Sequence, residues 1–266
     1  MAKKNKELKV PTGRSLLYFI LKPIILFAYR KKPKIINLAG ELRKDAIIVS
    51  NHSAMSGPPS LELYYPVKTC KWGAHEMFGN HKARTAYMRD ILYIKKKHMK
   101  PGWKTSLKAW LLAWLNPCVY KGMKNLPTYT DGRLGKTIKV SIKAIEKGYS
   151  VMIFPENSNE GYFDVLTEFF PGFVMLAQHY FAVKGEDIPV YPVYISVSKH
   201  IIVIDKPMFV QDYVKQGLNR YQIAEIFKDK VNDLYFKYVE NAEVYDDKAE
   251  QKRLKAERKA LKKASK

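Results

Sequence analysis

The chemistry that this sequence suggests begins with an Asn-His pair placed directly after an apolar run. The stretch AIIVS, residues 46–50, is rich in β-branched side chains and leads straight into Asn51, His52 and Ser53. Such a run predicts a buried strand, and the polar residues after it would lie where the strand leaves the sheet. The unperturbed pKa of histidine, about 6.5, suits a general base near neutral pH. A lone histidine in a turn is usually structural, so a catalytic interpretation of His52 depends on its neighbours.

A second segment of the chain has the same form. The apolar run YSVMIFP, residues 149–155, leads into the polar stretch ENSNEGY, residues 156–162. If the two strands are close neighbours, Glu156, Asn157 and Ser158 would line the same edge as His52. The two segments together predict one polar site at that edge.

Strands alternate with helices along most of the chain. The segment GKTIKVSIKAIEKG predicts a helix with Ile138, Ile142 and Ile145 on one face and Gly148 at its end. Two more helices and two more strands are predicted at residues 171–183, 221–238, 188–197 and 200–205. This alternation predicts an α/β fold with a mostly parallel or mixed central sheet and helices on both faces.

Composition and charge limit the possible functions. The 266 residues are 47% hydrophobic and 27% charged, which predicts a folded body with a sizeable core. The formal net charge of +22 predicts attraction to nucleic acid or to an anionic membrane surface. Nucleic acid is the weaker interpretation, because the lysines are spread along the chain and the aromatic residues lie in apolar company. Cys70 and Cys118 lack metal-like spacing and predict free thiols in a reducing compartment.

Two apolar segments flanked by lysines suggest contact with a membrane. Leu16 to Tyr29 is interrupted by Lys22-Pro23 and is shorter than the roughly 20 apolar residues of a spanning helix. The second segment places tryptophans and leucines on one helical face, at Trp103, Leu107, Trp110, Leu111, Trp114 and Leu115. We expect both segments to lie in the membrane interface; the alternative is that both pack on the folded domain.

The expected organisation has three parts. Residues 1–33 would form a basic and apolar N-terminal membrane anchor with an interfacial helix, and residues 34–245 would form the folded domain. Residues 246–266, rich in Ala, Lys and Glu, predict a charged tail that is a solvated helix or disordered.

In their order along the chain, these motifs resemble the glycerolipid acyltransferases, the PlsC-like family typified by lysophosphatidic acid acyltransferase. That family opens its site with Asn-His, four further residues and Asp, and here Asn51-His52 is followed at that spacing by Gly57. The family's later block, Phe-Pro-Glu-Gly-Thr-Arg-Ser, is matched by FPENSNE at residues 154–160, and its Val-Pro-Val type strand by IPVYPV at residues 188–193. The similarity covers about residues 34–207.

The resemblance implies transfer of a fatty acyl group from acyl-CoA or acyl carrier protein to a hydroxyl of a lysophospholipid such as lysophosphatidic acid. His52 would take the proton of the attacking hydroxyl, with neither a metal nor another cofactor. The basic residue that holds the substrate phosphate would be Lys121, with the run Lys95-Lys96-Lys97 as the competitor. The residues expected to contact substrate are Asn51, Ser53, Lys121, Phe154, Pro155, Glu156, Asn157 and Ser158.

The sequence departs from the family at Gly57, which cannot orient His52 as the family's Asp does. In one explanation another carboxylate takes that role, and we expect Glu62 rather than Glu76 because it is closer in sequence. In a second, His52 works slowly, positioned by a backbone carbonyl or by Ser56. In a third, the chain is a lipid-binding relative without catalysis. On the first explanation, Gly57→Asp should recover the activity that Glu62→Gln removes.

The remaining expectations concern location and metals. We expect a peripheral or monotopic protein on the cytoplasmic face of a membrane, with an anionic bilayer as its partner and no nucleic acid. The six histidines are scattered, with no pair at the spacing of metal ligands on a helix.

Overall fold

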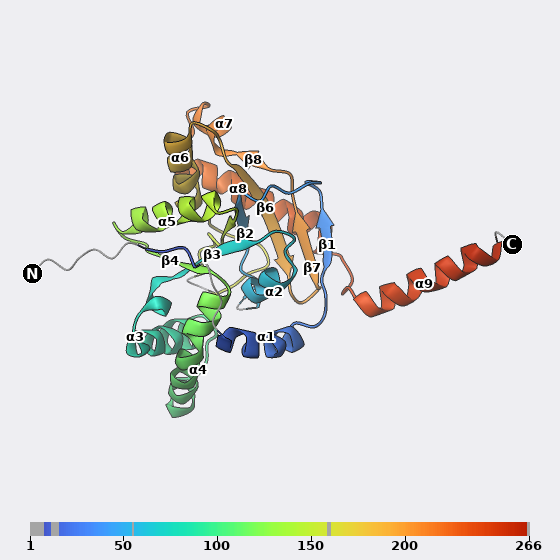
Figure 1. Cartoon of the computed structure of the whole chain (residues 1–266), viewed down its shortest axis with the longest axis horizontal. Coiled ribbons are helices and arrows are strands. Elements are labelled where there is room, and N and C mark those ends of the chain that lie inside the picture. The colour runs from blue at the N-terminus through green and yellow to red at the C-terminus, as the bar shows by residue number, and fades with distance from the viewer. Residues whose placement is uncertain (1–7, 12–15, 55, 159–160, 265–266) are drawn as a thin grey trace, which may run out of the picture.

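The computed structural model describes residues 8–11, 16–54, 56–158 and 161–264 (Figure 1). Its centre is an eight-stranded sheet in the order β1-β7-β6-β2-β5-β3-β4, with β8 paired to β6. The strands are β1 (Lys34–Asn37), β2 (Ile47–Ser50), β3 (Thr69–Ala74), β4 (Asn125–Thr128), β5 (Ser150–Ile153), β6 (Pro189–Ser196), β7 (Ile201–Ile204) and β8 (Met208–Phe209). The pairs from β6 through β2, β5 and β3 to β4 are parallel, as is β1 with β7, whereas β6 pairs antiparallel with β7 and β8.

Helices connect the strands and cover the sheet (Figure 1). The α-helices are α1 (Leu16–Ala28), α2 (Gly57–Tyr64), α3 (His81–Ala86), α4 (Trp103–Gly122), α5 (Leu134–Glu146), α6 (Gly172–Lys184), α7 (Val210–Val214), α8 (Arg220–Tyr238) and α9 (Asp247–Ala264). A 3-10 turn, η1 (His75–Phe78), and a π-helical segment, η2 (Tyr87–Lys95), complete the described elements.

The central strands carry apolar residues on both faces, because helices cover both. In β2, Ile47 and Val49 belong to the core formed with α5, α6 and α8, whereas Ile48 points to the opposite core, beside Leu61 of α2. This alternation follows from the two-residue period of a strand. The predicted α/β class, with a mixed sheet and helices on both faces, is therefore confirmed.

A third, smaller core joins η1, η2 and α4, and it explains the orientation of the tryptophan helix. The side of α4 that packs inward is formed by the small residues Ala109 and Ala113, both fully buried. The large side chains face outward, at Trp103, Leu107, Trp110, Leu111, Trp114 and Leu115. Trp103 is 72% exposed and Trp114 61% exposed, so these tryptophans are not core residues.

Helix α1 packs on α4 and has the same character. Tyr18 is buried on Gly122, where any side chain would overlap with the tyrosine ring. Most of the other large apolar side chains of α1 are exposed, at Leu16, Phe19, Ile20, Ile24, Leu26 and Phe27. In the described part of the chain, no helix combines the length and apolar character needed to cross a bilayer.

Candidate active site

The two polar segments predicted to meet do meet at one edge of the sheet. Strands β2 and β5 pair in parallel, so the residues that follow Ser50 and Ile153 leave the sheet on the same side. The backbone N–H of His52 donates a hydrogen bond of 2.8 Å to Oε2 of Glu156, which is 8% exposed. The Glu156 carboxylate therefore ties the histidine turn to the end of the neighbouring strand.

The imidazole of His52 is half-buried among aromatic rings. Its centroid lies 4.9 Å from that of Tyr162 in a stacked arrangement and 5.1 Å from that of Phe154. Nδ1 contacts the backbone carbonyl oxygen of Ala54. That contact uses one ring nitrogen and leaves Nε2 as the nitrogen that can accept a proton from a substrate.

This environment favours a neutral imidazole. Burial lowers the pKa of His52 to about 4, although the Ala54 carbonyl opposes the effect; the charge of Lys96 lowers the pKa further. Burial also raises the pKa of Glu156, against the hydrogen bond from His52 and the charge of Lys96. At neutral pH, His52 is therefore unprotonated and ready to accept a proton.

Lys96 brings a positive charge to this site from the end of η2. Its Nζ donates a hydrogen bond of 2.5 Å to the hydroxyl of Ser158 and lies 5.3 Å from the ring centroid of Tyr162. Burial lowers the pKa of Lys96, the charge of Glu156 opposes this, and Lys95 adds to it. Lys121, expected to hold the substrate phosphate, lies exposed in the last turn of α4. Among the described residues, the competing run Lys95-Lys96-Lys97 supplies the lysine that contacts the later motif.

Several other predicted substrate contacts have structural partners instead. Both amide atoms of Asn51 bond the backbone of Ile195, Nδ2 to its oxygen at 2.9 Å and Oδ1 to its N–H at 2.8 Å. The hydroxyl of Ser53 accepts a bond of 3.3 Å from the N–H of Val197. The side-chain amide of Asn51, expected to contact substrate, therefore joins the ends of β2 and β6.

The later motif, residues 154–160, is likewise held by hydrogen bonds within the protein, through its described residues. The Pro155 oxygen accepts a bond of 2.7 Å from the N–H of Phe170, and the Asn157 side chain donates a bond of 2.5 Å to Glu168. Met55, Asn159 and Glu160, which belong to the two motifs, lie outside the described residues.

Neither candidate carboxylate is the group on Nδ1 of His52. The Glu62 carboxylate lies 2.6 Å from Nζ of Lys71, a side chain of β3 that is 1% exposed. Glu62 also does not contribute to the shift in the pKa of His52. The Glu62 carboxylate is thus paired with a buried lysine, and a backbone carbonyl contacts Nδ1 of His52, where a carboxylate was expected.

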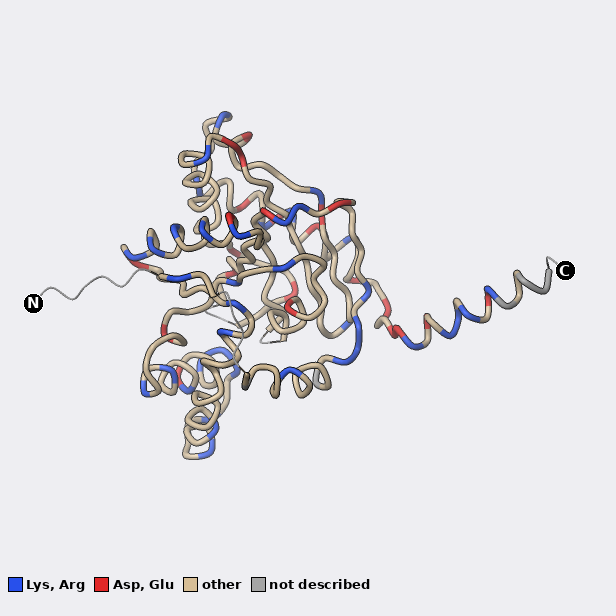
Figure 2. Tube along the Cα trace, viewed as in Figure 1, with Lys and Arg blue, Asp and Glu red and all other residues tan. Residues whose placement is uncertain are grey.

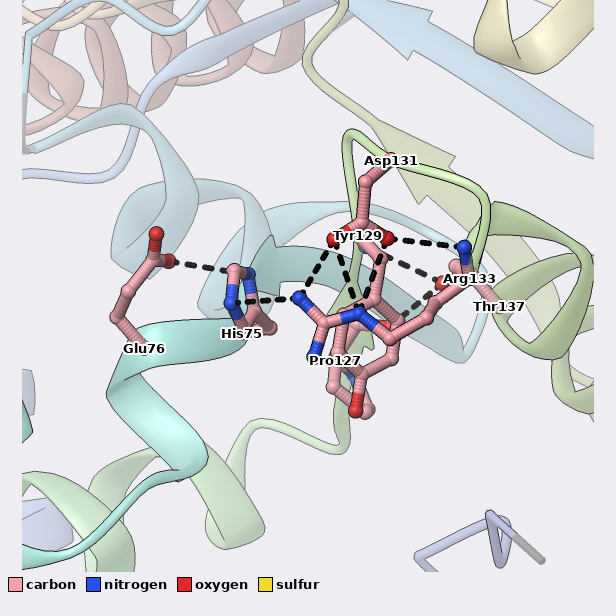
Figure 3. A network of polar contacts seen from close by, with 7 residues as sticks. All are labelled: His75, Glu76, Pro127, Tyr129, Asp131, Arg133 and Thr137. Atoms are coloured by element: carbon pink, nitrogen blue, oxygen red, sulfur yellow. Dashed lines mark hydrogen bonds and ion pairs between the residues drawn. The ribbon is translucent and has the colours of Figure 1, made fainter. Parts of the chain in front are cut away.

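Glu76, the second candidate, belongs to a separate network after β3 and β4 (Figure 3). Its carboxylate lies 3.3 Å from Nδ1 of His75, and Nε2 of the same ring lies 3.4 Å from the Arg133 guanidinium. Arg133 in turn bonds Asp131 and stacks on Tyr129, with its central carbon 4.3 Å from the ring centroid. This guanidinium lowers the pKa of Asp131 to about 2. The network orders the loop that enters α5, because Asp131 also accepts from the backbone N–H of Arg133.

The described residues contain no cluster of three or more His, Cys, Asp or Glu side chains that could hold a metal ion. The His52 ring and the Lys96 ammonium both lie against Tyr162 in this region, and Phe154 packs on His52. Sequence reasoning offered a backbone carbonyl as one of three explanations for the missing aspartate, but it could not single out that of Ala54, because a carbonyl gives no side-chain signal.

Comparison with known proteins places the chain in a family. The family model described as Acyltransferase matches residues 32–196, from β1 to the end of β6. This chain belongs to the acyltransferase family. Among solved structures it is similar to that of the 1-acyl-sn-glycerophosphate (LPA) acyltransferase PlsC from Thermotoga maritima, with 14% identity, a TM-score of 0.47, and coverage of 83% of this chain and 81% of that one. A comparison with curated proteins finds no match.

Proposed function

We propose that this acyltransferase moves a fatty acyl group from a thioester, acyl-CoA or acyl carrier protein, to a hydroxyl of a lysophospholipid such as lysophosphatidic acid. The observation that carries the proposal is the state of His52: a neutral ring, held on Nδ1 by a carbonyl, with Nε2 left for the substrate. An alcohol is a poor nucleophile at neutral pH, so a positioned base is what this reaction needs.

We propose the following steps at this site. The acceptor hydroxyl attacks the thioester carbonyl carbon while Nε2 of His52 takes its proton. The tetrahedral intermediate then collapses, the carbon–sulfur bond breaks, and the proton on Nε2 passes to the leaving thiolate. No acyl-enzyme forms and no cofactor takes part.

Lys96 is the residue that we assign to the phosphate of the acceptor. Its ammonium carries the positive charge nearest the later motif, bonded to Ser158 and partly withdrawn from water. An ion pair with a phosphate would be stronger there than on the open surface, because the surroundings screen charge less. Lys121 lies exposed at the end of α4, away from these contacts.

We further propose that α1 and α4 dock the protein on an anionic bilayer. Both helices expose large apolar side chains, and they lie on one side of the molecule (Figure 1). Lysines lie along the same helices (Figure 2), including Lys104 and Lys108 among the tryptophans of α4. Exposed tryptophan beside lysine suits the headgroup boundary of an anionic membrane. The protein would then act as a peripheral or monotopic enzyme on the cytoplasmic face.

The alternative function, a lipid-binding relative without catalysis, is favoured by Gly57 in place of the family's Asp. A panel of labelled lysolipids, supplied with acyl-CoA and with acyl carrier protein thioesters, separates the two. We expect transfer by the native protein and none by His52→Gln, at similar melting temperatures. His179→Gln, on an exposed position of α6, is the matched control and should keep full activity. Transfer by His52→Gln at the native rate would remove this histidine from the mechanism.

Membrane docking has its own test. Trp110→Glu combined with Trp114→Glu should weaken flotation with vesicles that contain anionic lipid, because both side chains would enter the interface. Phe236→Glu is the control, since Phe236 is 47% exposed on α8, outside α1 and α4. Equal flotation of the double variant and the native protein would contradict docking through α4.

A further inference from the structure

The turn after His52 differs from the family motif in more than one missing side chain. Ser53 and Ala54 both have left-handed backbones, with φ of 43° and 55°. Two consecutive residues with side chains rarely adopt this conformation, which favours glycine. The turn brings the Ala54 carbonyl back onto Nδ1 of His52.

Gly57 makes a close approach in the same turn. A β-carbon added to Gly57 would lie 2.9 Å from the carbonyl carbon of His52 and closer still to its oxygen. Helix α2 begins at this glycine, with Pro58 and Pro59 next. The helix therefore starts directly against the backbone of His52, and any side chain at position 57 would displace one of them.

We propose that the Ala54 carbonyl takes the place of the family's carboxylate as the group that orients His52, and that Gly57 is the positioning residue that makes this turn possible. The contribution of this turn to catalysis rests on the proposed function of His52 as a base. The carbonyl accepts the Nδ1 proton, which selects the tautomer with its lone pair on Nε2. A carboxylate in the family position and this carbonyl contact are mutually exclusive, since the carboxylate requires a β-carbon where Gly57 touches His52.

The strained conformation persists because the surrounding structure determines it on every side. The Glu156 carboxylate accepts a hydrogen bond of 2.8 Å from the N–H of His52. The side chain of Asn51, the residue before His52, donates a hydrogen bond to the backbone oxygen of Ile195. The Ser53 hydroxyl accepts from the N–H of Val197 at 3.3 Å. Strain that is kept by several independent bonds, beside a side chain that can do chemistry, is typical of a functional turn.

The proposal predicts that restoring the family's aspartate at position 57 lowers activity rather than raising it. Gly57→Asp would restore the family residue, and an acidic residue in the first turn of a helix is ordinarily favourable. Here the added β-carbon must push the His52 carbonyl away and so separate Nδ1 from Ala54. We expect Gly57→Asp to lower kcat/KM by about 100-fold, the scale reported for displacement of a catalytic group by about 1 Å. Gly57→Ala should show a similar loss, because the β-carbon alone is responsible.

The test is nitrogen NMR of the full chain with labelled histidine, beside the transfer assay with lysophosphatidic acid. In the native protein at pH 7 we expect His52 to carry its proton on Nδ1, with a shift typical of a hydrogen-bonded nitrogen. Gly57→Ala should lose that signature. Gly135→Ala is the matched control, since a β-carbon at this exposed helical glycine meets nothing within 4 Å, and it should change neither the tautomer nor the rate.

The outcomes separate this inference from the proposed function. A native His52 protonated on Nε2 at pH 7 would overturn the inference, and so would Gly57→Asp that transfers faster than the native chain. The Nδ1 tautomer in the native protein, lost in Gly57→Ala, supports the positioning role even if no lysolipid is acylated, in which case the proposed function fails by itself.

Discussion

The pH dependence of His52 offers the sharpest test of the site. The perturbation is a change of pH combined with Lys96→Met, because the charge of Lys96 is one cause of the lowered pKa of His52. Removing that charge should raise the pKa of His52 towards its ordinary value. Lys97→Met, at the exposed neighbouring position, is the matched control.

The magnitude follows from the fall in the pKa of His52 from 6.5 to about 4. One pKa unit corresponds to about 1.4 kcal/mol, so protonating this ring costs the folded protein roughly 3 kcal/mol more than it costs the unfolded chain. Because the folded pKa is below the unfolded value, the unfolded chain binds more protons between these two pH values. Stability should therefore fall as the pH drops from 6.5 towards 4, and His52 should contribute no slope above 6.5.

Two measurements check this prediction. The acid limb of kcat/KM reports the free enzyme and should lie near pH 4, so that the rate changes little between pH 7 and about pH 5. Urea unfolding across this range should show a slope with pH that His52→Gln lacks. Lys96→Met should move the acid limb to higher pH, and Lys97→Met should leave it in place. An acid limb near pH 6.5 in the native enzyme would refute the burial of the ring.

Three further predictions concern stability and the pH dependence of the rate. Lys71→Met should lower the free energy of unfolding by about 3–5 kcal/mol, because it removes one partner of a buried ion pair; a loss below 1 kcal/mol in urea unfolding would contradict this. Glu62→Gln should leave the acid limb of His52 unmoved, because the causes of the lowered pKa of His52 are burial, the Ala54 carbonyl and Lys96 rather than Glu62. Glu156→Ala should cost about 1–3 kcal/mol and slow transfer, because the His52 N–H loses its acceptor, whereas Glu156→Gln, which keeps an oxygen, should lose less in thermal unfolding and in rate.

Much of the fold could be predicted because its central elements carry strong local signals. The β-branched runs became β2 and β7, and the isoleucine stripe became α5, with Gly148 just beyond it at a φ of 75°. Other strands gave no such signal. Strand β3 contains Lys71 and Gly73, and β4 contains Pro127 at the border of the sheet, where a missing N–H is tolerated. Their place in the sheet is decided by neighbours rather than by their own composition.

The site, like the fold, could be predicted from the sequence only where local signals were strong. The parallel pairing of β2 with β5 brought His52 and Glu156 to one edge, as the pattern of two apolar runs with polar ends predicted. A backbone carbonyl was one alternative that the sequence left open, but the carbonyl of Ala54 could not be singled out, because its position depends on two left-handed backbones and every residue possesses a carbonyl. The pairing of Glu62 with Lys71 was not foreseen, because Lys71 lies on a strand that the sequence did not reveal.

A carbonyl differs from a carboxylate in one respect that matters for the reaction. Both can hold the imidazole in the right tautomer, but a neutral carbonyl gives less stabilisation to the imidazolium that forms when His52 takes a proton. The charge of Lys96 makes that cation less favourable still. A bound phosphate on Lys96 would cancel this repulsion, so that His52 becomes the stronger base when the acceptor is in place. The acid limb of kcat, which reports the enzyme–substrate complex, should therefore lie at higher pH than that of kcat/KM, and Lys96→Met should narrow the gap.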